Sequence, residues 1–167
     1  MKNVAIGILV IILASILIEP LVELLNLGRE NIVLGTAITN SARSAKDRSL
    51  EYDAQRNLNA QVDEETFADY FSEAFEEAMN VTRTNSGESD TSLEFRSNDG
   101  KYNDITVTLD FQEEENRDTE QIVSTVTMEA ESNYKFKTKY MKLAEDAGED
   151  VDYMLTERRV LVLSIKN

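Results

Sequence analysis

Apolar side chains dominate the first part of the chain. Between Val4 and Ile18 no residue is charged, and only one glycine and one serine interrupt the Val, Ile, Leu and Ala side chains. A helix of this composition is apolar on every side, so it must lie in lipid or among other protein segments. Continued to Leu27, the run is long enough to cross a hydrocarbon core of roughly 30 Å. The pattern predicts that segment 4–27 lies in a membrane or in the core of an assembly.

A cleaved signal peptide is the alternative interpretation, because a basic start and a short apolar run are typical of such peptides. Here Glu19-Pro20 and a second apolar run follow Ile18, and no small-residue cleavage site precedes a polar start. We therefore expect the segment to remain attached to the rest of the chain. Since Pro20 cannot donate a helical hydrogen bond and its ring crowds the preceding turn, a kink or a melted turn is predicted at residues 16–20.

The helical pattern continues from Gly28 to Ala60, where apolar residues recur every three or four positions. The apolar stripe is narrow and consists mainly of small side chains, which let another element approach closely. We expect Ala42 and Ala45 to make such a close contact, either with a neighbouring subunit or with the chain's own sheet. Gly28 and Gly35 are predicted weak points at which the helix bends or breaks.

A second helix is predicted from its start signals. Asp63 is a good N-cap residue, and Val62 and Phe67 have the spacing of a hydrophobic staple. Apolar side chains then follow at helical spacing as far as Met79. The polar residues 80–90 predict a loop.

From Ser92 onward the apolar period changes from helical to two, which predicts an antiparallel sheet. We expect a hairpin turn at Asp99-Gly100, a solvated loop at 113–115, a turn at 131–133 and a short helix at 141–148. The last strand, 153–165, is predicted to lie in the middle of the sheet because Val160–Ile165 is apolar on both faces. The side chains expected on the other strands are Leu93 and Phe95; Ile105, Val107, Leu109 and Phe111; Ile122, Val126 and Met128; and Tyr134, Phe136 and Tyr140.

Composition narrows the chemistry. The chain has no Cys and no His, which removes thiolate chemistry, the commonest general base and the usual transition-metal ligand. An acidic cluster, Asp146, Glu149, Asp150 and Asp152, could hold calcium, but it lacks the spacing of a known calcium loop and fits a solvated turn better. We therefore expect no catalytic residue, no cofactor and no metal, and we do not expect an enzyme.

The formal charge of −15 argues against nucleic-acid binding, which needs a basic face. The charge is unevenly distributed, because residues 1–62 are neutral overall and the remainder carries all of it. A neutral, apolar segment joined to an acidic domain indicates an anchor attached to a water-exposed body.

The order of these elements resembles that of the type IV pilin-like proteins, which have a long N-terminal helix, apolar in its first half and amphipathic in its second, packed on an antiparallel sheet. The resemblance covers the whole chain at the level of architecture, and Pro20 lies where such pilins often have a proline. Pilins usually carry Glu as the fifth residue after processing, whereas this chain has Ala5. Because of this difference from the pilins, we expect either an uncleaved anchor of a divergent filament protein or a chain whose Met1 is itself the processed first residue.

The resemblance implies an α+β, lollipop-shaped subunit with a stem helix at 1–60 and an extracellular globular domain at 61–167. It implies subunits that wait in the membrane with the N-terminus inside, and then polymerise through their stems into an extracellular pilus-like filament with the help of assembly machinery. The role of such a filament, including adhesion, is left open. The alternative is a single-pass, membrane-anchored accessory or receptor protein that never polymerises.

Two acidic residues interrupt the apolar run. Glu19 and Glu23 either lie hydrated at the membrane edge or have a specific partner, because an ionised carboxylate in an apolar medium is costly. The resemblance suggests that Glu19 meets Lys2 or the amino terminus of a neighbouring stem. Lys2 and Glu19 of the same chain cannot pair, since a helix from Lys2 to Glu19 is about 25 Å long.

Overall fold

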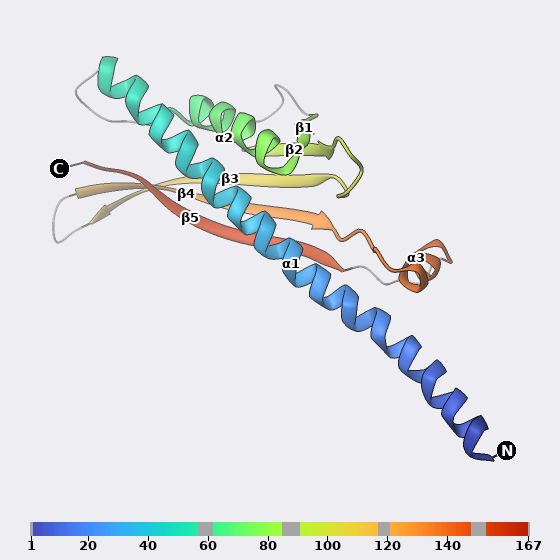
Figure 1. The fold of residues 1–167 in the computed structure, drawn as a ribbon. Helices are drawn as coiled ribbons and strands as arrows, with labels where there is room; N and C mark the ends of the chain where they lie inside the picture. Colours follow the sequence, from blue (N-terminus) through green and yellow to red (C-terminus); the bar gives the residue numbers. More distant parts are fainter. Residues whose placement is uncertain (1, 57–61, 85–90, 117–120, 148–152, 167) are drawn as a thin grey trace.

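One helix runs along the whole molecule and a single sheet packs against its second half (Figure 1). The computed structural model describes residues 2–56, 62–84, 91–116, 121–147 and 153–166. Helices occupy α1 (Lys2–Arg56), α2 (Glu64–Met79) and α3 (Lys139–Asp146). The strands are β1 (Val81–Arg83), β2 (Ser92–Ser97), β3 (Ile105–Asn116), β4 (Gln121–Asn133) and β5 (Met154–Lys166). The predicted α+β fold, with an apolar N-terminal helix and an antiparallel sheet, is confirmed.

Helix α1 is continuous, so the melted turn expected at residues 16–20 and the breaks expected at Gly28 and Gly35 were wrong. Pro20 lies inside the helix at an exposed position, and the helix keeps its direction on both sides of it (Figure 1). Proline removes one hydrogen bond to the preceding turn, and the helix nevertheless continues through it. At Gly35 a Cβ would lie 2.6 Å from the guanidinium of Arg159 on β5, which is the end of a flexible and partly exposed side chain.

Helix α2 begins as its sequence predicts. The Asp63 side chain accepts hydrogen bonds from the backbone N–H and the hydroxyl of Thr66, at 2.9 and 2.7 Å. These bonds hold the pKa of Asp63 below its usual value, the hydroxyl contributing most. The helix ends at Asn80, whose left-handed backbone conformation (φ 53°) is one that asparagine tolerates.

The five strands form an antiparallel meander in the order β1-β2-β3-β4-β5. The hairpin turn at Asp99-Gly100 is confirmed: Gly100 has a φ of 67°, and Asp99 accepts hydrogen bonds from the Lys101 N–H and the Ser97 hydroxyl, both at 2.9 Å. Residues 81–83, expected in a loop, form the short edge strand β1 because they pair with 95–97. Residues 113–115 and 131–133 also belong to strands rather than to a loop and a turn.

The last two expectations for the sheet were also wrong. Segment 134–140 is not a strand. The N–H group of Tyr134 donates to the Tyr153 carbonyl at 2.7 Å, but the N–H groups of Lys137 and Thr138 donate to Glu23 of α1. Strand β5 lies at an edge of the sheet, not in its middle. Its outward-facing valines stay uncovered, and Val160 is 63% exposed, because the two long helices cover only the opposite face.

The hydrophobic core lies between that inner face of the sheet and the helices α1 and α2. Four stacked or tilted phenylalanine rings, Phe67, Phe71, Phe75 and Phe95, form its centre. Ala42 and Ala45 are 1% and 0% exposed, and they belong to this core. Their small size therefore serves close packing of α1 within the chain, and the option of a contact with a neighbouring subunit was wrong.

Candidate functional site: the free stem and its junction with the body

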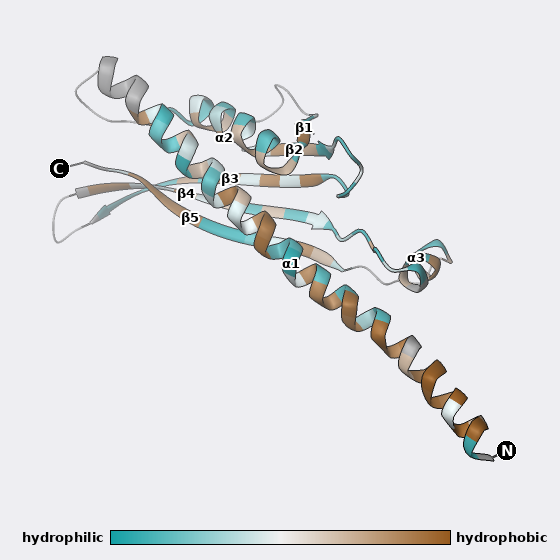
Figure 2. Ribbon diagram, viewed as in Figure 1, coloured by the Kyte–Doolittle hydropathy of each residue, from teal (hydrophilic) through white to brown (hydrophobic). Residues whose placement is uncertain are grey.

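The first third of α1 projects beyond the sheet and α2 (Figure 1). We call residues 4–22 the free stem, and α1 from Glu23 onward, together with α2, α3 and the sheet, the body. Figure 2 shows that the free stem is almost uniformly hydrophobic. Its large apolar side chains are all exposed, namely Val4, Ile6, Ile8, Leu9, Val10, Ile11, Ile12, Leu13, Ile16, Leu17, Ile18, Leu21 and Val22.

By length and composition, α1 is the one helix among the described residues that could cross a membrane, and its most apolar window is not buried at all. The core helix of a soluble protein would be buried, so the free stem has the properties of a membrane anchor or of a signal sequence. Its 19 residues span about 28 Å, close to the hydrocarbon thickness of a bilayer.

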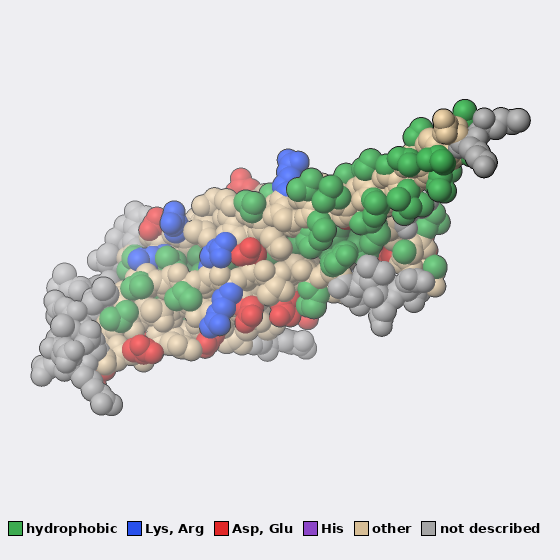
Figure 3. Space-filling model, turned by 90° about the horizontal axis from the view of Figure 1, so that it is seen from below, with side chains coloured by type: hydrophobic (Ala, Val, Ile, Leu, Met, Phe, Trp, Pro, Cys, Tyr) green, Lys and Arg blue, Asp and Glu red, His purple; other side chains and the backbone are tan. Residues whose placement is uncertain are grey.

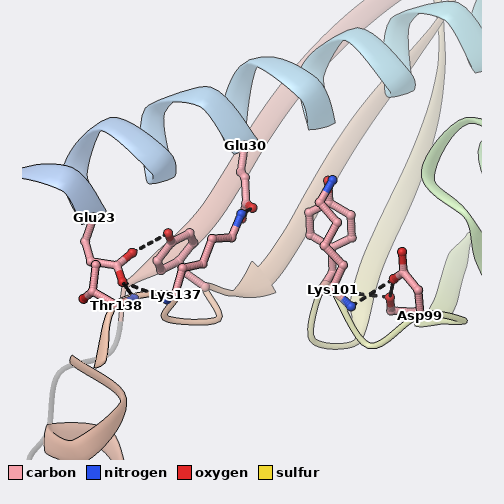
Figure 4. Close-up of polar contacts among 9 residues, drawn as sticks. Glu23, Glu30, Asp99, Lys101, Lys137 and Thr138 are labelled. Carbon is pink, nitrogen blue, oxygen red and sulfur yellow. Dashed lines mark hydrogen bonds and ion pairs between the residues drawn. The ribbon is translucent and has the colours of Figure 1, made fainter. Parts of the chain in front are cut away.

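A buried carboxylate marks the place where the free stem enters the body. Glu23 is 1% exposed and accepts hydrogen bonds from three donors of the segment after β4 (Figure 4). These are the Tyr134 hydroxyl at 2.6 Å, the Lys137 N–H at 2.7 Å and the Thr138 N–H. Thr138 is the N-cap residue of α3 and makes no capping bond with its own side chain. Glu23 thus holds the N-cap residue of α3 from another helix, and its negative charge lies near the N-terminus of α3, where acidic groups are favourable.

A second carboxylate, two turns further along the same side of α1, strengthens the junction. Glu30 is 4% exposed and pairs with the Lys137 ammonium (Figure 4). Burial is the main cause that lowers the pKa of Lys137, and Arg29 adds to it, whereas Glu23 opposes it. Burial, followed by the hydrogen bond to Glu23, raises the pKa of Tyr134, so this phenol stays protonated and keeps donating.

The predicted assembly residues therefore separate into three groups. Pro20 is exposed and Glu19 half-buried, both on the free stem, and the side chain of Lys2 lies outside the described part of the chain. Glu23 is not hydrated at a membrane edge, as one interpretation had it, because the body covers it. Ala42 and Ala45 are core residues.

Sequence reasoning missed the partners of Glu23. Tyr134 and Lys137 are more than 110 positions away from it, as the separations of 111 and 114 show. One signal was available: Glu23 and Glu30 are seven residues apart, and so are Glu30 and Ala37, which places all three on one helical stripe with the core residues.

Apolar surface continues past the junction along the outer side of α1. Leu25 and Ile32 are each 69% exposed, and Val33 is also exposed. Ile32 lies nine residues beyond Glu23, so it stands about 13 Å above the point where the body begins. In the space-filling view the apolar side chains cover the free stem and extend onto the adjoining surface (Figure 3).

Among the described residues no cluster of three or more His, Cys, Asp or Glu could hold a metal ion. Asp146 lies exposed at the end of α3, and the other three residues of the candidate calcium cluster lie outside the described residues. Comparisons with protein-family models, with curated proteins and with solved structures gave no match to this chain.

Proposed function

We propose that this protein is a structural subunit of an extracellular, pilus-like filament, resembling the type IV pilin-like proteins. The subunit first resides in a membrane, with the free stem in lipid, the N-terminus inside and the body outside. During assembly the free stems leave the lipid and pack against one another, which keeps their apolar surface out of water throughout.

The observation that carries the proposal is the apolar surface beyond the junction. If the free stem spans the bilayer, Glu23 lies at the membrane boundary, and Ile32 and Val33 stand in water in an isolated subunit. Neighbouring stems would cover both side chains in a filament. A contiguous exposed apolar surface of this kind is typical of a protein interface.

The alternative is a membrane-anchored accessory or receptor protein that does not polymerise. The match between the length of the free stem and the bilayer supports both proposals equally. The exposed side chains at positions 32 and 33 favour assembly, because a simple anchor needs no apolar surface above the membrane.

Electron microscopy of sheared cell-surface material, with antibodies against the body, tests the proposal. We expect filaments that contain this chain, and their loss when Ile32→Ser removes the exposed side chain. Asn40→Ser, an exposed change on the same helix, is the control and leaves the filaments intact. Both variants should remain in the membrane fraction in equal amounts. If the wild-type chain stays in the membrane and no filament contains it, the anchored, non-polymerising protein is the better description.

A further inference from the structure

Helix α3 is the element of the body that reaches furthest toward the free stem. It lies beyond the ends of the strands, on the side from which the stem projects (Figure 1). Its first turn is held at the level of Glu23 by the bonds from Lys137 and Thr138 to that carboxylate. If residues 4–22 occupy the hydrocarbon core, α3 lies in the headgroup region.

The two sides of α3 differ in character. Met141 and Ala144, three residues apart, are partly buried, and Met141 packs against the core. The opposite side carries Lys139, Lys142 and Leu143, whose spacing of three and four residues places them together. Leu143 is 54% exposed and is not among the described apolar side chains that pack against the core.

The basic residues gather just before α3 and in its first half, although α3 as a whole carries two lysines and two acidic residues. The protein has 32 acidic and 17 basic residues, yet segment 135–142 contains four lysines and no acidic residue. Lys137 is engaged by Glu30, and Lys135 donates to the Gly100 carbonyl at 2.6 Å. Lys139 and Lys142 remain exposed, while Glu145 and Asp146 follow at the other end of the helix.

We infer that α3 docks on the membrane surface and recognises anionic phospholipid headgroups. Lys139 and Lys142 contact the phosphates, and Leu143 enters the boundary between headgroups and acyl chains, as in other interfacial amphipathic helices. This inference rests on the membrane-resident stage of the proposed function. Docking holds the body at a defined orientation to the bilayer before the stem leaves it.

The absence of tryptophan from the chain offers a direct test. The full-length Leu143→Trp variant is reconstituted in nanodiscs of phosphatidylcholine alone, or of phosphatidylcholine with phosphatidylglycerol. We expect tryptophan emission at shorter wavelength, and quenching by lipids brominated near the headgroup, in the anionic discs and at low salt. Adding Lys139→Gln and Lys142→Gln should weaken docking about 25-fold, about fivefold per lysine, whereas Arg43→Gln and Arg158→Gln, two exposed cations elsewhere on the body, should leave it unchanged.

Two further single-tryptophan variants separate the possible failures. Leu13→Trp reports on the free stem, and Gln112→Trp reports on an exposed position of β3. If Leu13→Trp is not quenched by deeply brominated lipids, the membrane-resident stage itself is wrong. If Leu13→Trp is quenched but the emission of Leu143→Trp equals that of Gln112→Trp in the anionic discs, docking of α3 is refuted. Equal insertion of Leu143→Trp in both lipid mixtures, or insertion unaffected by the lysine changes, refutes the recognition of anionic headgroups.

Discussion

Removal of the Glu23 carboxylate is the sharpest test of the junction between free stem and body. In Glu23→Ala, the Tyr134 hydroxyl and the N–H groups of Lys137 and Thr138 lose their acceptor in a site closed to water. Each hydrogen bond to a charged group contributes about 1.5–3 kcal/mol, but the three share one carboxylate and are not additive. Truncation of a buried, charged network costs about 3–5 kcal/mol, and we expect a loss of stability in this range.

Glu23→Gln is the matched control, because glutamine can satisfy the same groups. Its carbonyl oxygen can accept from both N–H groups, and its amide can donate to the Tyr134 hydroxyl, which is able to accept as well as to donate. We therefore expect Glu23→Gln to cost only about 1–2 kcal/mol, the difference between charged and neutral hydrogen bonds. Tyr134→Phe removes one donor and keeps the edge-on contact with Phe136, whose ring centroid is 5.6 Å away.

The assay is urea unfolding of the full-length protein in detergent, followed by the near-ultraviolet circular dichroism of its tyrosines. Amide hydrogen exchange at Lys137 and Thr138 is measured in parallel and should accelerate in Glu23→Ala much more than in Glu23→Gln. A coupling energy between Glu23→Ala and Tyr134→Phe, from a double-mutant cycle, should be clearly above zero. A loss of less than about 1 kcal/mol in Glu23→Ala, or equal destabilisation by alanine and glutamine, would refute the stabilising role of the buried Glu23 carboxylate.

Three further predictions concern other parts of the molecule. Ala42→Leu overpacks the core and should lower the free energy of unfolding by about 1–3 kcal/mol; unchanged urea unfolding would contradict the close contact of α1. Asp63→Ala removes the cap of α2 and should cost about 1 kcal/mol. The hydrogen bonds from Thr66 lower the pKa of Asp63 in the folded state. The stabilisation by this cap is therefore fully present above the unfolded-state pKa of about 4, and it is lost as the pH falls through the folded-state pKa. Thermal unfolding at several pH values measures this loss. Glu19→Gln should give fewer or shorter filaments with unchanged membrane insertion if Glu19 sets the register between stems; normal filaments in electron micrographs would favour a hydrated Glu19 at the membrane interface.

Local signals in the sequence determined the elements with the shortest range of interaction. The run from Val4 to Ile18 has no side that water can solvate, so composition alone predicted a helix that lies in lipid or against other protein. Only the structure showed that its large apolar side chains are exposed. The cap at Asp63 and the turn at Gly100 depend on groups two to four residues apart, and both were predictable for that reason. Alternation of apolar and polar residues was likewise sufficient to predict the antiparallel sheet.

Tertiary structure decided everything that depends on distant partners. The same valine-rich pattern in β5 fits a central strand or an edge strand, and only the pairing of whole strands and the position of the helices on one face made it an edge. Segment 134–140 has the composition of a strand, but the backbone N–H groups of Lys137 and Thr138 bond Glu23 instead of another strand. Whether the Glu23 carboxylate is hydrated or buried depends on donors of Tyr134 and Lys137, which lie 111 and 114 positions away in the sequence. A sequence pattern records which side chains avoid water, whereas the fold determines which chemical groups replace it.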